Sequence, residues 1–237
     1  MTVVTVCSHF PTQDYYTHRA FFESCKKFGY LPIVLGRGNE YGGLGSKPRL
    51  LKQAIESGQV NDTNIIFCDA WDIVFQQTPA LCEEWMHTHP NKIWWNAEKN
   101  CFPNPKFIDQ FPETKTPFRY LNSGFSVGPT ELYFQALKEM KAEEIPNDKQ
   151  NEDGSWSTPN DQEYFQKAYL FGNVPMGLDT RAQLCHTLAG VEPSELDFSE
   201  PLIRNKESGS TPIAIHANGG QKEIWKPLIL NHLNLPL

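Results

Sequence analysis

The sequence predicts an α/β fold in which a mixed, mostly parallel sheet is flanked by helices. Residues 3–7 form a short apolar run, and residues 15–28 carry apolar side chains at helical spacing before Gly29, a typical helix C-cap. Residues 31–35 form a second apolar run. A strand, a helix and a strand in this order are typical of a right-handed crossover between parallel strands. A chain of 237 residues can bury one sizeable core, so we expect residues 1–237 to form a single domain.

The stretch from residue 64 to residue 72 joins an apolar run to two carboxylates. Residues 64–68 are short, apolar and β-branched at their start, which is typical of a core strand in a parallel sheet. Ligands gather at the carboxyl ends of such strands, so Asp69 and Asp72 are candidate ligands of Mg²⁺ or Mn²⁺ beside substrate phosphates. The pattern is equally consistent with Asp69 capping a turn and with Asp72 being solvated.

The remaining elements alternate in type along the chain. Residues 143–159 are polar and predict a surface loop, after which Asn160 is a natural N-cap. Asn122 and Ser123 predict a polar turn beside a strand. Further helices are expected at 47–57, 79–87, 130–141, 160–171 and 223–233, and further strands at 92–96, 174–178 and 212–215, with one more in the stretch 120–128 that also holds this turn.

A glycine-rich segment precedes the second expected helix. Gly36 to Gly45 holds five glycines around Tyr41, which suits a loop that approaches a ligand closely. The segment matches neither G-x-G-x-x-G nor G-K-[ST], so neither fingerprint is met. Lys47 lies in the first helical turn, where the helix dipole disfavours a cation, and another partner is expected for it. A solvated lysine is the commoner outcome at such a position.

Four further polar residues are candidates for a site. Glu98 leaves a tryptophan-rich strand at its carboxyl end, where it would contact a substrate or lie on the surface. Asn122 offers hydrogen bonds to sugar hydroxyls or to its own turn. Asp161 lies in a first helical turn, where acidic residues commonly complement the dipole. A lone histidine at a strand end, such as His216, is more often structural than a metal ligand.

Charge and composition exclude several classes of protein. The net charge of −7 and the pI near 5.5 argue against a nucleic-acid surface, which needs Lys and Arg. No window approaches the roughly eighteen apolar residues of a membrane span. The first residues predict a strand rather than a secretory leader, so we expect a cytoplasmic protein. No C-x-x-C occurs, and we expect reduced, mostly buried thiols at Cys7, Cys25, Cys68, Cys82, Cys101 and Cys185.

Taken in order, these segments resemble the glycosyltransferase domain at the N-terminus of procollagen lysyl hydroxylases, a GT-A fold related to the Rossmann type that uses UDP-sugars with Mn²⁺. The resemblance covers nearly the whole chain and rests on nine motifs in the same order. They are a T-V-x-T-like first strand, Asn39-Glu40-Tyr41-Gly42-Gly43, Lys47-x-Arg49, Asp69-x-x-Asp72, Ala97-Glu98-x-x-Cys101-Phe102-Pro103, Leu121-Asn122-Ser123-Gly124, Asp161-Gln162, Leu178-Asp179 and His216-x-Asn218-Gly219.

The resemblance implies a metal, a donor and an acceptor. It makes Asp69, Asp72 and His216 the ligands of Mn²⁺, with Mg²⁺ as a second candidate, and two carboxylates with an imidazole suit such ions. It implies UDP-glucose or UDP-galactose as donor and a protein or glycan hydroxyl as acceptor, such as hydroxylysine or galactosyl-hydroxylysine in a collagen-like chain. The residues implied to contact the donor, the sugar or the acceptor are Tyr41, Lys47, Trp71, Phe102, Asn122, Asp161, Gln162, Asn218 and Gly219.

This chain departs from the family pattern at three places. Phe102 replaces a tryptophan and loses its N–H donor, and Leu50 replaces a nucleotide-side tryptophan. Thr158-Pro159-Asn160 replaces an acidic run and leaves Asp161 as the carboxylate there. Of the properties that the family implies, the choice of acceptor is therefore the one that carries over least to this chain.

The sequence leaves the mechanism and two other functions open. If the anomeric configuration inverts, Asp161 or Glu98 would take the acceptor's proton; if it is retained, neither need act as a base. A UDP-sugar or glycan-binding module without catalysis is the alternative from another class. A metal-dependent phosphohydrolase has the carboxylates but lacks the clustered ligands of a two-metal site.

Overall fold

The computed structural model describes residues 1–8, 16–38, 42–221 and 228–235. Its helices are α1 (Tyr16–Phe28), α2 (Ser46–Glu56), α3 (Pro79–Thr88), α4 (Thr130–Glu139) and α5 (Asp161–Phe171), with 3₁₀ turns η1 (Pro105–Gln110), η2 (Ala142–Glu144), η3 (Pro193–Glu195) and η4 (Gly219–Gln221). Its strands are β1 (Thr2–Val6), β2 (Pro32–Leu35), β3 (Asn64–Cys68), β4 (Ile73–Phe75), β5 (Ile93–Glu98), β6 (Tyr120–Pro129), β7 (Lys149–Gln150), β8 (Trp156–Ser157), β9 (Met176–Asp179), β10 (Cys185–Thr187), β11 (Leu196–Asp197), β12 (Arg204–Asn205) and β13 (Ala214–His216).

The main sheet has six strands in the order β2-β1-β3-β6-β5-β9. The pairs β1–β2, β1–β3 and β5–β9 are parallel, and β6 runs antiparallel to both of its neighbours. The prediction of a mixed, mostly parallel sheet flanked by helices is therefore confirmed. Because β6 is reversed, its amino end lies beside the carboxyl ends of β3 and β5.

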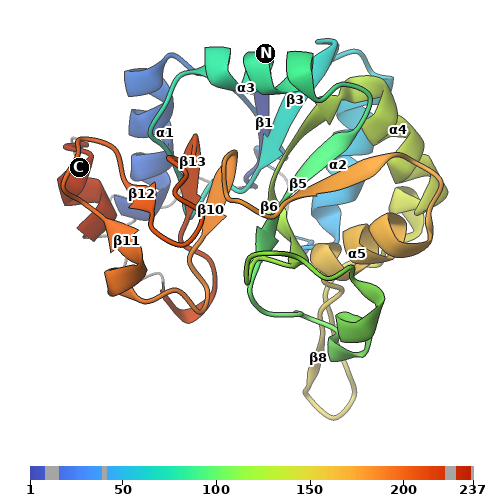
Figure 1. Cartoon of the computed structure of the whole chain (residues 1–237). Coiled ribbons are helices and arrows are strands. Elements are labelled where there is room, and N and C mark those ends of the chain that lie inside the picture. The colour runs from blue at the N-terminus through green and yellow to red at the C-terminus, as the bar shows by residue number, and fades with distance from the viewer. Residues whose placement is uncertain (9–15, 39–41, 222–227, 236–237) are drawn as a thin grey trace.

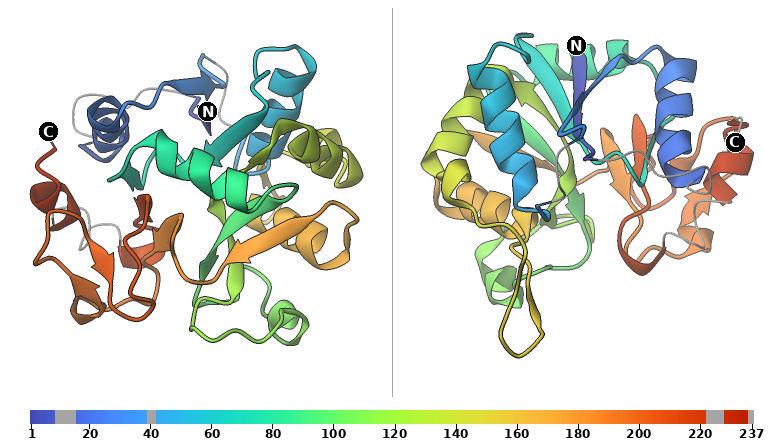
Figure 2. Two further views of the ribbon diagram at one scale, coloured as in Figure 1. Left: turned by 45° about the horizontal axis from the view of Figure 1, so that its top comes forward. Right: turned by 180° about the vertical axis from the view of Figure 1, so that it is seen from behind.

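Helices cover both faces of the main sheet (Figures 1 and 2). Successive residues of a strand point to opposite faces, and the core divides accordingly. Val4, Ile65 and Phe67 pack on the face covered by α2, α4 and α5, whereas Val3 and Ile66 pack on the face covered by α1 and α3. The core therefore has one layer on each side of the main sheet, and a third buried cluster, which includes Val74, Ile215 and Leu230, lies against the small sheet.

A second sheet of three short strands, in the order β10-β13-β4, lies beside the first. β13 is parallel to β10 and antiparallel to β4, with His216 opposite Ile73. The sequence did not predict β4 or β10, because three residues are too few for a period-two pattern. This small sheet brings the C-terminal part of the chain back to the segment after β3.

Several local predictions need correction. Asn122 and Ser123 lie inside the long strand β6 rather than in a turn, and Glu98 is the last residue of β5 rather than part of a loop. A serine before the expected helix 47–57 is a natural N-cap, but residue 45 is the N-cap of α2 and the Ser46 hydroxyl donates to the Gly43 carbonyl. The predicted loop 143–159 contains the hairpin β7–β8, which projects from the molecule in Figure 1. Each error concerns polar residues whose local preference was overridden by pairing or packing.

Two further features concern the cysteines and the hydropathy of the helices. The six cysteines are free thiols, and all except Cys101 are buried. Within the described ranges, none of the helices has both the length and the hydropathy that a bilayer-crossing segment requires.

Candidate active site

Two aspartates and one histidine converge at the carboxyl end of β3. Asp69 follows β3 directly, Asp72 precedes β4, and His216 is the last residue of β13. The His216 Nε2 atom lies 3.4 Å from Asp72 Oδ1 and 3.8 Å from Asp69 Oδ2. One ligand atom from each residue lies within 4.8 Å of the others. The structure therefore brings together the three residues that the resemblance implies as metal ligands.

Backbone pairing places these three side chains. The Ala217 amide donates to the Asp72 carbonyl at 2.8 Å, which extends the β13–β4 ladder one residue beyond His216 and Ile73. The Asp69 amide donates to the Gly124 carbonyl at 2.9 Å, which extends the β3–β6 ladder by one residue. The β13–β4 and β3–β6 ladders thus end close together, and the side chains of Asp69, Asp72 and His216 lie where they end.

The chemistry of this cluster suits a divalent metal ion. His216 is 2% exposed, and neither ring nitrogen has a hydrogen-bond partner among the described residues. A buried imidazole without a partner is costly, and a metal bond would satisfy one nitrogen. Ligand atoms about 2.1 Å from an ion lie about 3 Å apart when they are adjacent in an octahedron, close to the separations seen here. Oxygen and imidazole ligands together suit Mn²⁺, Mg²⁺ and related ions.

Lys47 joins this cluster from the first turn of α2. Its Nζ atom lies 2.6 Å from Asp69 Oδ1 and 2.9 Å from Asp161 Oδ2, so the expected partner of this lysine exists. Burial by itself lowers the pKa of Lys47, but Asp161 and Asp69 outweigh it and raise that pKa. Burial and the nearby Asp72 raise the pKa of Asp69, against the opposing effects of Lys47 and His216.

Glu98 is the centre of a buried network of amides. The Asn122 Nδ2 and Gln162 Nε2 atoms donate to Glu98 Oε1 at 3.1 and 2.7 Å. The Asn218 Nδ2 atom donates to Glu98 Oε2 at 3.2 Å. Glu98 is 3% exposed, and burial raises its pKa while the three amides oppose this rise. One carboxylate therefore fixes three side chains from β6, α5 and the segment after β13.

The predicted substrate contacts Gln162 and Asn218 use their amides within the protein. Gln162 also donates to the Phe102 carbonyl at 2.5 Å and accepts from the Ser123 amide at 3.0 Å. Asn218 Oδ1 accepts from the amides of residues 188 and 189 at 3.0 and 2.9 Å. These side chains shape the site by holding its backbone segments together.

The other residues predicted to contact the donor or the acceptor differ in how exposed they are. Phe102 is 57% exposed beside the site, and Gly219 is exposed with a φ of +68°. Trp71 is half-buried against the core. Tyr41 lies outside the described residues. Of these aromatic side chains, Phe102 offers the larger open surface to a substrate.

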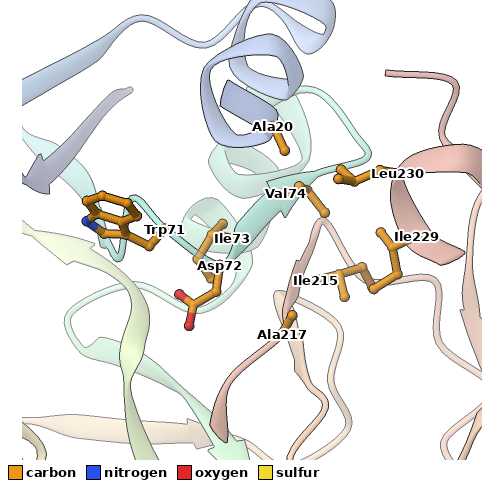
Figure 3. A pocket seen from close by; sticks show the side chains of 9 residues that line it. All are labelled: Ala20, Trp71, Asp72, Ile73, Val74, Ile215, Ala217, Ile229 and Leu230. Atoms are coloured by element: carbon orange, nitrogen blue, oxygen red, sulfur yellow. The ribbon is translucent and has the colours of Figure 1, made fainter. Parts of the chain in front are cut away.

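A small apolar cavity of about 10 Å³ lies behind Asp72. Figure 3 shows its lining, with the Trp71 ring pointing away from the cluster formed by Val74, Ile215 and Leu230. A volume of this size holds about one water molecule. The cavity is thus a packing defect between β4, β13 and the helical residues 228–232, and a nucleotide does not fit in it.

Sequence reasoning missed Asn96, which contacts the amide network around Glu98 through Asn122. Asn96 is fully buried; its Oδ1 accepts from the Phe125 amide and its Nδ2 donates to Asn122 Oδ1, both at 3.3 Å. A polar residue inside the apolar strand 93–97 was the available signal, since a buried amide needs partners.

Comparison with solved structures identifies the class of fold. A glycosyltransferase involved in the glycosylation of the major capsid of PBCV-1 aligns over 97% of this chain and 98% of its own, with a TM-score of 0.53 and 12% identity. This chain therefore shares the fold of that glycosyltransferase.

The family follows from the sequence comparison. The model of the PLOD GT domain family matches residues 1–234, and the chain belongs to that family of glycosyltransferases. A multifunctional procollagen lysine hydroxylase and glycosyltransferase of Caenorhabditis elegans is 30% identical over 94% of this chain, and the human LH3 enzyme of the same description is 26% identical over 90%. The chain spans 31% and 29% of the lengths of these two relatives.

Proposed function

We propose that this chain is a Mn²⁺-dependent hexosyltransferase that moves glucose or galactose from a UDP-sugar to a hydroxyl acceptor. The proposal depends on the convergence of Asp69, Asp72 and His216 in a chain of the PLOD GT domain family. Lys47 lies beside this cluster and adds a positive charge that suits a diphosphate. Mg²⁺ is the second candidate for the metal.

The residues in and around the Asp69, Asp72 and His216 cluster have different proposed roles. Asp69, Asp72 and His216 would hold the ion, which when bound supplies Lewis-acid stabilisation of the charge that grows on the diphosphate leaving group. The Lys47 ammonium is already held between two aspartates, so little reorganisation is needed for it to stabilise the same charge. Exposed Phe102 would give the sugar or the acceptor an apolar wall.

In an inverting reaction a carboxylate takes the acceptor's proton, and Asp161 and Glu98 are the two candidates for this base. Glu98 already accepts three amide hydrogen bonds, whereas Asp161 is paired with one ammonium. We therefore assign the base to Asp161 in an inverting reaction and give Glu98 a positioning role. A retaining reaction would need neither as a base.

The proposed acceptor is a hydroxyl of hydroxylysine or of its galactosyl derivative in a collagen-like chain. The support is the family itself and the relatives described as procollagen lysine hydroxylases and glycosyltransferases.

A transfer assay tests this function. UDP release from UDP-glucose and UDP-galactose would be measured with Mn²⁺ and with hydroxylysine or galactosyl-hydroxylysine peptides, in wild type, Asp72→Ala and His216→Ala. We expect turnover in wild type and in Asp109→Ala, an exposed matched control, and loss in the two ligand variants. Equal turnover in all variants would overturn the metal assignment. Saturable UDP binding without transfer would favour a binding module, and free phosphate without transfer a phosphohydrolase.

A further inference from the structure

Gly124 is buried in the middle of β6 and lies directly under the His216 ring. A Cβ atom built at this position would lie 2.0 Å from His216 Cε1, 2.6 Å from Nδ1 and 2.7 Å from Nε2. These separations are far below van der Waals contact. The imidazole therefore occupies the space that a side chain of residue 124 would fill.

The backbone conformation does not require glycine at this position. Gly124 is absent from the positive-φ glycines, and it lies within an extended strand that any residue can adopt. Glycine in a strand interior commonly marks the close approach of another group. Here that group is the ring of one metal-ligand candidate.

The backbones of Gly124 and His216 are both held in place by strand pairing, so a clash between them can be relieved only at the imidazole side chain. The Gly124 carbonyl accepts from the Asp69 amide at 2.9 Å, and its amide donates to Asn122 Oδ1 at 2.9 Å. Phe125 is in register with Cys68. His216 is 2% exposed on a strand held on both sides by β10 and β4. A methyl group at residue 124 would thus be relieved by rotation of the imidazole away from the two aspartates.

We propose that Gly124 is the positioning residue that sets the His216 imidazole against Asp69 and Asp72 for metal binding. The inference rests on the proposed metal site. It makes the Asn122-Ser123-Gly124 segment a junction, because Asn122 contacts Glu98 while Gly124 contacts His216 and the backbone of Asp69. Strand β6 therefore contacts both the amide network and two of the metal-ligand candidates.

A double-mutant cycle in thermal stability tests the contact without using activity. Gly124→Ala should lower the Tm by roughly 5 °C in the wild-type background, because the added methyl overpacks a buried site. In the His216→Ala background the same substitution should change the Tm by little, since the ring is gone. Equal losses in both backgrounds would overturn the proposal. If Gly124→Ala alone does not fold, recovery in the double variant supports the proposal and its absence overturns it.

Gly128→Ala is the matched control. Gly128 lies on the same strand, and its Cβ would lie 2.8 Å from the Ile93 backbone, so this variant should be destabilised equally with and without His216. Binding of Mn²⁺ in the presence of UDP, measured by EPR, should weaken roughly tenfold or more in Gly124→Ala but not in Gly128→Ala. Unchanged Mn²⁺ affinity in Gly124→Ala would contradict the positioning role. Failure of wild type to bind Mn²⁺ would instead refute the proposed function, and the stability cycle would still report on the contact.

Discussion

The Lys47 ammonium lies 2.9 Å from the Asp161 carboxylate and joins the first turn of α2 to the first turn of α5. The same ammonium also pairs with Asp69. A single cation thus connects two helix starts to the carboxyl end of β3, and the ligand cluster, the proposed base and the proposed phosphate contact form one charged group.

Replacing Lys47 by methionine should destabilise the protein by roughly 3 kcal/mol, because Asp161, 2% exposed, would keep a buried charge without its partner. Urea unfolding at pH 7 measures this loss. Lys167→Met removes a more exposed i,i+4 pair on α5 and should cost about 0.5 kcal/mol or less. Similar losses in the two variants would contradict a structural role for the Lys47 pair.

Glu98→Gln should cost about 1–3 kcal/mol, since one carboxylate oxygen is replaced by an NH₂ group that faces amide donors. Chemical denaturation would measure the loss against Glu113→Gln, whose parent side chain is 88% exposed. If Glu98 acts only as a base, the activity would fall while the unfolding free energy stayed at the wild-type value.

Mn²⁺ should stabilise the wild-type protein by about 2.7 kcal/mol at a concentration of 100 times its Kd, because it binds the folded state. Differential scanning calorimetry with Mn²⁺, and again after chelation, follows this effect. The shift should vanish in Asp72→Asn and persist in Asp109→Asn. A shift that survives in Asp72→Asn would place the binding site elsewhere.

Acid should destabilise the protein through His186, which is 1% exposed on β10. Burial lowers the pKa of His186 to about 3, helped by Lys99 and opposed by Glu195. Above about pH 6.5, His186 is neutral in both the native and the unfolded state. Below about pH 6.5, it binds a proton in the unfolded chain but stays neutral in the native state. Its contribution should therefore fall by about 1.4 kcal/mol per pH unit from pH 6.5 to about pH 3.

Unfolding measured at several pH values in wild type and His186→Leu isolates this residue. The two stability curves should run parallel above about pH 6.5, and wild type should lose more stability below it. Parallel curves down to pH 4 would show that His186 takes up a proton in the native state.

The sequence predicted the main sheet well where the signal is local. The β-α-β opening, the strand before Asp69 and the cap of α5 all depend on side chains within a few positions, and Asn160 Oδ1 accepts from the Gln162 amide at 3.0 Å as expected. Asn122 was misplaced in a turn, because its preference for turns is weaker than the pairing of a ten-residue strand with two neighbours.

Local signals in the sequence indicate the candidate chemistry: the carboxylates after β3, the histidine at a strand end and the order of motifs that resembles one family. The folded structure supplies the 3.4 Å contact between His216 and Asp72, which only the resemblance implied, and the meeting of three amides at Glu98, which no motif implied. The reason is physical, because these contacts depend on strands of three residues and on groups far apart in the chain, and neither leaves a periodic pattern in the sequence.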